Sequence, residues 1–298
     1  RTLLVTATTV LSCMLSEFFS RKIMKRQGTL GDLSAIVTGI LLAFNLPATI
    51  PLWVAAIGSV VAIVVVKQSF GGIGQNFVNP ALVGRIVLMA SFPTMMSTWV
   101  QPFAWRGVQV VTTASPLASI SSMFTAGDVS AAATASNPAL PSLWQMLIGQ
   151  RQGSLGEVCA LALLLGFAYL LIRRVITPVI PLTYIGTVAV IMLIAGKGSL
   201  SFVAYEILGG GLLLGAIFMA TDYTTSPINF KGKLIYGVGC GILTALIRLF
   251  GSLPEGVSFS IIIMNILVPH IERLTTPKPF GSAKTPKKKQ SRKKEAGA

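Results

Sequence analysis

The chain has 298 residues, of which 53% are hydrophobic and only 11% are charged, and its formal net charge is +15. A typical soluble globular domain carries about 25% charged residues, and a disordered chain lacks long apolar runs, so both classes are excluded. The apolar runs are continuous and do not alternate with polar residues, which excludes an outer-membrane barrel. The composition therefore predicts an all-α, polytopic helical membrane protein.

Nine apolar segments predict membrane-spanning helices, and in chain order they are 2–20, 31–46, 51–67, 78–92, 156–173, 178–196, 202–220, 234–250 and 257–272. The first is followed by a basic cluster and by no small-residue cleavage site, so we expect a membrane helix there and not a signal peptide. Two segments, 31–46 and 78–92, are short and flanked by Pro, Gly and Asn. They predict broken helices that meet inside the bilayer.

Basic residues mark one side of the membrane, because they follow every odd-numbered segment: Arg21, Lys22, Lys25, Arg26, Lys67, Arg173, Arg174, Lys231 and Lys233. Residues 274–298 add eight Lys or Arg and one acid. Positive charge is typical of cytoplasmic loops and of contact with anionic membrane lipid, so we expect a multi-pass protein of the bacterial inner membrane with a cytoplasmic tail. The loop 93–155 is then outside. The basic cluster 284–294 contains no aromatic residue and no folded basic module accompanies it, so no nucleic-acid partner is expected.

Two stretches, 54–86 and 237–271, resemble each other. Each runs from an apolar helix through a basic residue and Phe-Gly to an asparagine, Asn79 or Asn265, in the next helix. The predicted copies lie an odd number of crossings apart, which would make an inverted repeat. The single membrane domain 1–298 then divides into a first half, 1–92, the loop 93–155, a second half, 156–273, and the tail 274–298. Chance similarity between apolar helices is the alternative.

Few polar residues lie within the apolar segments. Thr221 and Asp222 belong to the stretch 219–227, which either holds a polar ligand or forms a capped turn. Asn76 and Asn79 follow three glycines that either let the backbone approach a ligand or build a re-entrant turn. Arg85 lies in a short segment, and a buried arginine there requires a partner. Asp32 and Glu206 are acids of the same kind.

Cysteine and histidine chemistry is scarce in this chain. Cys13, Cys159 and Cys240 each stand alone in an apolar run, so neither a zinc site nor a cysteine-ligated iron–sulfur cluster is expected. No metal ligands are assigned. In the outer loop, Ser115 precedes a proline that favours an extended backbone and would present the serine hydroxyl. On its residues alone this is an ordinary Ser/Thr-rich loop.

Three motifs in order, LLAFNLP (41–47), FGGIGQNFVNPALVGR (70–85) and MATDYTTSP (219–227), resemble the D-subunit family of Rnf complexes. That family is related to the B subunit of the sodium-pumping NADH:quinone reductase. The resemblance extends from about 28 to 280 and is closer to the ferredoxin-using, clostridial type. It implies a fold similar to urea and ammonium channel-like transporters, with inverted repeats and broken helices.

The resemblance also implies a covalent flavin. In the family, FMN is joined through its phosphate to a threonine in a motif like D-x-x-S/T-G-A-T on the extracytoplasmic side. The matching stretch here is 109–115, and Ser115 stands at the flavinylated position, next to Thr112, Thr113 and Ala114. Gln109, Thr113 and Ser115 depart from the motif, and Thr112 and Thr113 are alternative attachment sites. A serine hydroxyl can form the same phosphoester.

The expected function is that of a flavin-carrying membrane subunit of an ion-translocating ferredoxin:NAD⁺ oxidoreductase, a redox-driven translocase that is not catalytically complete alone. It would carry covalent FMN and a second flavin such as riboflavin, with Asn76, Asn79, Arg85, Thr221 and Asp222 as further cofactor-binding candidates. Its expected partners are other Rnf subunits, of the A, B, C, E and G types, and a flavin transferase for maturation. A secondary transporter or channel for a small polar solute, or a membrane scaffold, are the alternatives.

Overall fold

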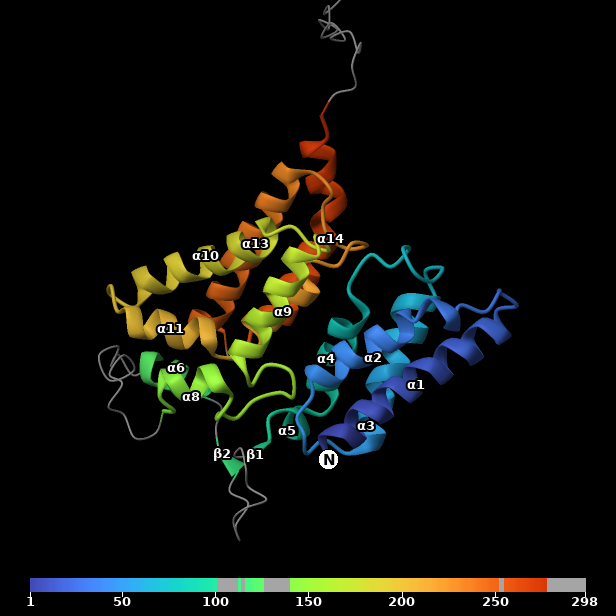
Figure 1. Ribbon diagram of the computed structural model, residues 1–298, viewed down its shortest axis with the longest axis horizontal. Helices are drawn as coiled ribbons and strands as arrows, with labels where there is room; N and C mark the ends of the chain where they lie inside the picture. Colours follow the sequence, from blue (N-terminus) through green and yellow to red (C-terminus); the bar gives the residue numbers. More distant parts are fainter. Residues whose placement is uncertain (101–111, 114–115, 126–139, 252–254, 278–298) are drawn as a thin grey trace, which may run out of the picture.

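The computed structural model describes residues 1–100, 112–113, 116–125, 140–251 and 255–277. Within these ranges the regular secondary structure is helical apart from one short antiparallel pairing, of β1 (Trp99–Val100) with β2 (Thr112–Thr113). The predicted all-α class is confirmed. Two groups of helices lie side by side in Figure 1, the N-terminal one in blue to cyan and the C-terminal one in yellow to red.

The N-terminal group is built around α1, which packs along α2 and α3. Its elements are α1 (Thr2–Ile23), η1 (Leu30–Asp32), α2 (Ser34–Phe44), α3 (Leu52–Val60), the π-helix η2 (Val61–Gln68), α4 (Pro80–Ser91) and α5 (Pro93–Met96). Gly39 permits the close packing of α1 and α2, since a Cβ there would lie 2.8 Å from the Cα of Val10. The sequence expectation of short helices at 31–46 and 78–92 holds for α2 and α4.

The C-terminal group repeats this packing around α10, which lies against α11 and α13. Its elements are α9 (Ala160–Ile172), α10 (Val179–Ala195), α11 (Leu200–Leu208), α12 (Leu212–Leu214), the π-helix η4 (Gly215–Met219), α13 (Phe230–Phe250) and α14 (Val257–Thr275). In the sequence, α6 (Pro116–Thr125) and α8 (Leu143–Ile148) come between the groups, and they pack on the C-terminal one, α6 against α13 and α8 against α9 and α11. The similar packing around α1 and α10 fits the predicted repeat.

The segment expected at 202–220 is helical but broken, because the chain bends by 64° between α11 and the α12–η4 helix. Three glycines, 209–211, occupy the bend, and Gly210 has a φ of +60°, a conformation that favours glycine. This is a broken helix like those expected in the first half. Hydropathy alone does not reveal it, because the apolar run continues through the glycines.

Three described helices are long and apolar enough to cross a membrane alone, namely α1, α13 and α14, and the bent α11–α12–η4 pair makes a fourth candidate. The other expected spans correspond to shorter apolar helices, which are α2, α3 with η2, α4, α9 and α10. The count of nine crossings stays a prediction. The positions of the apolar segments agree with the observed helices.

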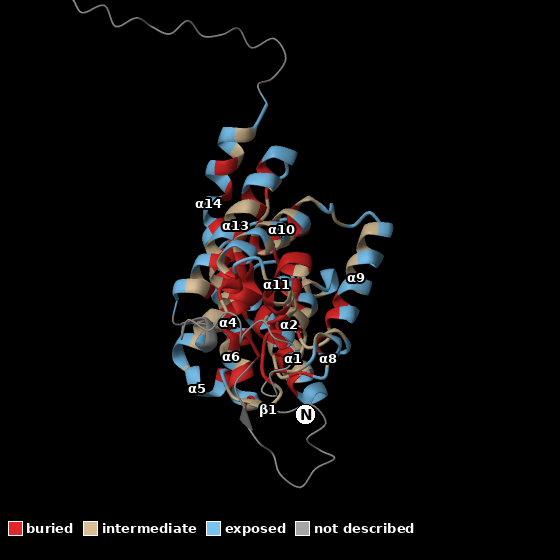
Figure 2. Ribbon diagram, turned by 90° about the vertical axis from the view of Figure 1, so that its left-hand side faces the viewer, coloured by how far each residue is buried: buried red, intermediate tan, exposed pale blue. Residues whose placement is uncertain are grey.

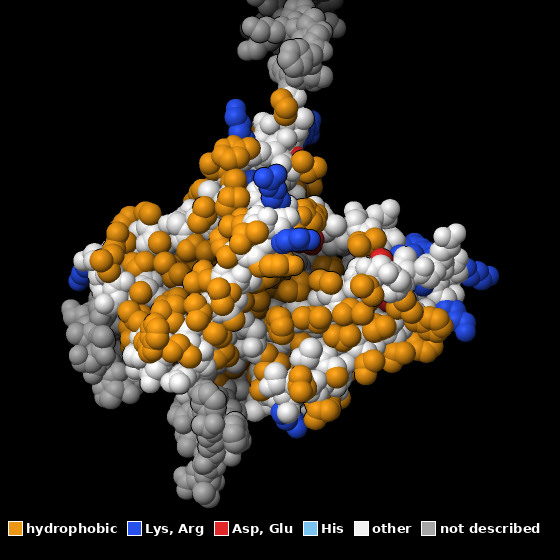
Figure 3. All heavy atoms as spheres, in the orientation of Figure 1, with side chains coloured by type: hydrophobic (Ala, Val, Ile, Leu, Met, Phe, Trp, Pro, Cys, Tyr) orange, Lys and Arg blue, Asp and Glu red, His pale blue; other side chains and the backbone are white. Residues whose placement is uncertain are grey.

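Unlike the core of a water-soluble protein, the interior of this fold contains many charged and amide side chains. Figure 2 shows the buried residues gathered at the centre of the molecule and exposed residues on the outer faces. Large apolar side chains cover the outside in Figure 3, as expected for a surface in contact with lipid tails. Buried polar residues include Glu17, Lys67, Arg85, Glu206 and Arg248.

Candidate functional site

The three sequence motifs converge on one residue, Met219, at the end of η4. The Asn45 amide donates to the Met219 sulfur over 3.4 Å. The Asn79 amide donates to the Met219 carbonyl oxygen over 3.5 Å. The chain positions 45, 79 and 219 therefore meet at the junction between the two helix groups, where an inverted repeat places its functional site.

Asn79 has two roles at this junction. Its Oδ1 accepts from the backbone N–H of Ala81 at 3.1 Å and of Leu82 at 3.4 Å, so it caps α4, which begins at Pro80. Asparagine is a favoured N-cap and proline a favoured first helical residue. The backbone nitrogen of Asn79 also lies 3.2 Å from the side-chain amide of Asn265. The two asparagines that mark the predicted repeat are thus in contact.

The turn before α4 positions Asn76. Gly71, Gly72 and Gly74 all have positive φ, so the glycines build a tight turn that other residues would strain. The Asn76 amide donates to the Val78 carbonyl oxygen and to the Thr224 hydroxyl, each over 3.1 Å. Asn76 therefore ties this turn to the stretch 219–227 of the other helix group.

Asp222 organises the turn of that stretch. Its carboxylate accepts from the Thr224 N–H at 3.3 Å, from the Thr224 hydroxyl at 3.1 Å and from the Thr225 hydroxyl at 3.3 Å. These bonds show that the motif forms a capped turn. Asp222 also lines a cavity, so the same carboxylate is placed to contact a ligand.

A cavity of about 360 Å³ lies between the two groups. Its polar lining comes from Asp32, Ser34, Thr38, Lys67, Asn76, Asn79, Asp222, Tyr223 and Thr224. Among the sequence candidates, Asn76, Asn79 and Asp222 are thus brought together, whereas Thr221 and Arg85 do not line this cavity. Such a volume with a few convergent polar groups is typical of sites for small organic ligands.

Asp32 lies in η1, in the turn before α2. The Asp32 carboxylate accepts hydrogen bonds from the backbone N–H of Ser34, at 2.8 Å, and from the Ser34 hydroxyl. These bonds hold the carboxylate in the turn that leads into α2.

Lys67 forms a buried ion pair that the sequence did not reveal. Its Nζ lies 2.8 Å from Glu17 Oε2, and both side chains are almost completely buried. The same nitrogen donates to the Ser34 hydroxyl over 2.5 Å. This pair joins α1, α2 and η2 beside the cavity.

Arg85 has the partner that its position requires. It donates to Asn45 Oδ1 over 2.7 Å and forms an ion pair with Glu255. In the C-terminal helix group, Arg248 pairs with Glu206 at 3.0 Å. The Arg85 contacts therefore connect α4 to both Asn45, after α2, and the segment before α14.

Glu157 joins this group of buried charges at the helix bend. A Cβ on Gly211 would lie 3.2 Å from Glu157 Oε2 and 3.4 Å from an Arg85 terminal nitrogen. Leu155 and Gly156 donate backbone hydrogen bonds, of 3.0 and 2.8 Å, to the carbonyl oxygens of Leu46 and Phe44. The end of the 93–155 loop is therefore fixed between the two helix breaks.

The predicted flavin attachment site is only partly within the described residues. Thr112 and Thr113 form β2, paired with Trp99–Val100. Ser115 and Ala114 lie outside the residues that the structure describes. The helix α6 begins directly afterwards at Pro116.

The described cysteines are free thiols, and Cys13 and Cys240 are buried. In the part of the chain that the structure covers, no group of three His, Cys, Asp or Glu could hold a metal ion. Three acids, Glu17, Glu206 and Glu255, are instead paired with Lys67, Arg248 and Arg85.

The fold and this junction define a polytopic helical membrane protein with broken helices around a central polar site. A model of the NQR2, RnfD, RnfE family matches residues 1–281, and the chain belongs to this family. The match confirms the resemblance that the three sequence motifs indicated.

This chain is similar to named relatives over most of its length. It is 44% identical to the D subunit of the Na⁺-translocating ferredoxin:NAD⁺ oxidoreductase complex of Acetobacterium woodii, over 96% of this chain and 84% of the relative. It is 40% identical to the D subunit of the proton-translocating ferredoxin:NAD⁺ oxidoreductase complex of Clostridium ljungdahlii, over 93% and 83%. It is 31% identical to the D subunit of the ion-translocating oxidoreductase complex of Escherichia coli, over 92% and 85%.

Proposed function

We propose that this chain is the electron-carrying membrane subunit of an ion-translocating ferredoxin:NAD⁺ oxidoreductase. The observation that carries the proposal is the identity of 44% with the D subunit of a complex so named, over 84% of that relative. The two relatives of highest identity described above are named for different ions, so the coupling ion is either Na⁺ or H⁺. The chain would act with other subunits, of the A, B, C, E and G types, in the bacterial cell membrane.

The covalent cofactor we propose is FMN on Ser115, attached by a flavin transferase. The serine hydroxyl supplies the oxygen of the phosphoester. On either side of this position the structure describes β2, which ends at Thr113, and α6, which begins at Pro116. Bound there, FMN would supply one- and two-electron redox chemistry, and the protein would supply its position and electrostatic surroundings.

The central cavity is the proposed site of a second flavin, such as riboflavin. An uncharged ring with alternating donors and acceptors suits the amides of Asn76 and Asn79. Asn76 offers its oxygen as an acceptor, since both of its N–H bonds are used by Val78 and Thr224, and Asn79 offers its second N–H as a donor. Asp222 and Asp32 offer acceptors for ribityl hydroxyls. Asn76, Asn79 and Asp222 are our candidates for direct contact, whereas Arg85 would act from behind through Asn45.

The experiment that tests covalent attachment is in-gel flavin fluorescence of the denatured chain from the purified complex. We expect a fluorescent wild-type band, loss of fluorescence in Ser115→Ala, and retention in the matched variants Thr112→Ala and Thr113→Ala. A non-fluorescent wild-type band contradicts a covalent flavin. A band that stays fluorescent in Ser115→Ala and darkens in one of the threonine variants moves the attachment site.

A transporter or channel for a small polar solute is the second candidate, favoured by the cavity between two groups of broken helices. Uptake of solute into liposomes by the flavin-free chain alone would support it. We expect no such uptake, because the proposed role of the cavity is to hold a cofactor.

A further inference from the structure

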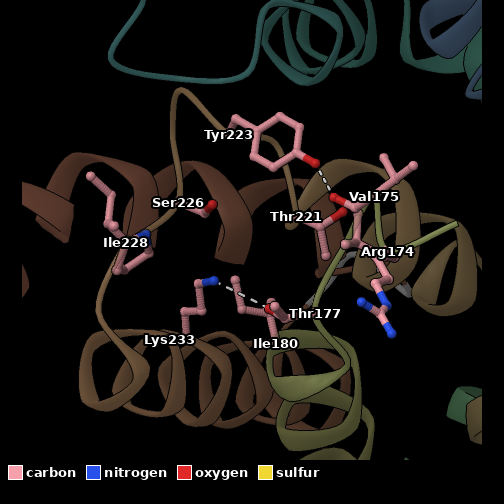
Figure 4. A pocket seen from close by; sticks show the side chains of 11 residues that line it. Arg174, Val175, Thr177, Ile180, Thr221, Tyr223, Ser226, Ile228 and Lys233 are labelled. Carbon is pink, nitrogen blue, oxygen red and sulfur yellow. Dashed lines mark hydrogen bonds between the residues drawn. The ribbon is translucent and has the colours of Figure 1, made fainter. Parts of the chain in front are cut away.

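A second cavity of about 360 Å³ lies on the other side of the 219–227 turn, and Tyr223 lines both cavities. It opens between the end of α9, the start of α10, the start of α13 and the turn itself (Figure 4). Its polar lining consists of Arg174, Thr177, Thr221, Tyr223, Ser226 and Lys233. We propose that this cavity binds the phosphate group of an anionic phosphate ester.

The first argument is charge. Arg174 and Lys233 both line the cavity, and no acidic residue does. Neither cation forms an ion pair among the described residues, where the three salt bridges lie elsewhere. An anionic ligand would therefore meet two cations whose charge the surrounding chain does not neutralise, which is the arrangement that phosphate groups favour.

Two acids near the cavity, Asp222 and Glu272, accept hydrogen bonds from the chain around it. Asp222 accepts hydrogen bonds from Thr224 and Thr225. Glu272, on α14, accepts from the Ile228 N–H at 3.1 Å. Their carboxylates thus hold the turn in place and do not enter the cavity lining.

The second argument is the supply of hydrogen-bond donors. Lys233 Nζ donates to the Thr177 hydroxyl over 3.2 Å, which uses one of its three N–H bonds. Because Thr177 accepts there, its own O–H can turn to a ligand. Figure 4 shows the Ser226 hydroxyl and the Lys233 nitrogen on the cavity side of their backbones. Thr221 is less available, because its hydroxyl donates to the Ile217 carbonyl oxygen at 2.6 Å.

Two helices add to this field. The helices α10 and α13 both begin at the cavity, at Val179 and Phe230, and neither has a side-chain hydrogen bond at its N-cap. Helix N-termini carry partial positive charge and unpaired N–H groups. They reinforce the attraction that Arg174 and Lys233 exert on an anion.

The rim of the cavity is apolar and indicates an ester, not free phosphate. Val175, Ile228 and the ring of Tyr223 line it and are exposed. An organic group attached to the phosphate could lie on these side chains while the phosphate meets Lys233. The ligand is therefore either the headgroup of an anionic phospholipid or a soluble phosphate ester, which share this chemistry.

The test is native mass spectrometry of the purified complex titrated with phosphatidylglycerol, with zwitterionic phosphatidylcholine as the comparison lipid. We expect the double variant Arg174→Ala, Lys233→Ala to lose affinity for phosphatidylglycerol by about tenfold or more, since about 1.4 kcal/mol corresponds to tenfold. The matched control is Arg173→Ala, Lys231→Ala, which removes equal charge from the same two segments outside the cavity lining. It should bind nearly as the wild type does.

Equal losses in the two double variants would overturn the proposal, because they would show a general attraction to a basic face. An unchanged affinity in the cavity variant would also overturn it. If the double variant does not assemble, the single variant Lys233→Gln takes its place with the same expected direction. Competition with glycerol 3-phosphate separates the sources: displacement of the lipid indicates a soluble ester, and its retention indicates a lipid headgroup.

Discussion

Charged side chains carry much of the organisation of this molecule, because they are buried where lipid surrounds the fold. Lys67 on η2 and Glu17 on α1 form an ion pair, with 2.8 Å between Lys67 Nζ and Glu17 Oε2. A buried pair adds little net stability compared with apolar residues, but removal of one partner leaves an uncompensated charge. Such pairs therefore fix which helices meet.

We predict that Lys67→Met destabilises the protein by about 3–5 kcal/mol, because Glu17 would remain buried without its partner. The melting temperature of the purified complex measures this. The double variant Lys67→Met, Glu17→Leu should recover most of the loss, since no orphan charge remains. A single variant as stable as the wild type would show that the pair does not organise these helices.

At the residue scale, the sequence showed that a buried charge needs a partner, but it did not show which residue that partner is. An arginine at position 85 of an apolar segment required a partner, and the structure supplies Asn45 and Glu255. Glu255 lies 170 residues further along the chain, so local spacing carries no signal for it. The pair Lys67–Glu17 was missed because Lys67 was interpreted as a basic residue at the end of its segment and Glu17 was assigned no role.

At the scale of elements, apolar run length predicted helix positions well, since the bilayer demands internally bonded backbone. The expected segments 178–196 and 257–272 correspond to α10 (Val179–Ala195) and α14 (Val257–Thr275). The bend at 209–211 was missed even though three consecutive glycines mark it. Hydropathy does not reveal such a bend, because three glycines neither end the apolar run nor lower its mean hydropathy enough to divide it.

Glycines also set how closely helices approach, which gives a matched prediction. Gly39→Ala would place a Cβ 2.8 Å from the Val10 Cα, an immovable backbone atom, and should cost about 1–3 kcal/mol by separating α1 from α2. Gly186→Ala in α10 meets no atom within 4 Å and should be neutral or stabilising by up to about 1 kcal/mol. Thermal unfolding of the two variants compares them directly. Equal stabilities would contradict the close α1–α2 contact.

At the scale of the whole molecule, two helix groups with similar packing meet at Met219, Asn79 and Asn265. The sequence predicted this meeting from a weak repeat and from motifs shared with a family. The cavities could not be predicted from the sequence, because their walls come from segments far apart in the chain. The orientation of the molecule rests on the distribution of basic residues and stays a prediction.

Orientation can be tested with single cysteines in a chain whose own three cysteines are replaced by serine. We predict that Lys231→Cys reacts with a membrane-impermeant thiol reagent only from the cytoplasmic side. Gln150→Cys, at the end of the outer loop, should react only from the opposite side. Labelling of both from one side would contradict the predicted topology and, with it, an extracytoplasmic FMN.

We propose that this protein carries electrons through a flavin bound covalently in the 93–155 loop. Intact-mass measurement of the chain from the purified complex, followed by fragmentation, tests this most directly. We expect a mass increased by one FMN phosphoester, located on Ser115 and absent from Ser115→Ala. An unmodified mass for the chain from an active complex would contradict it.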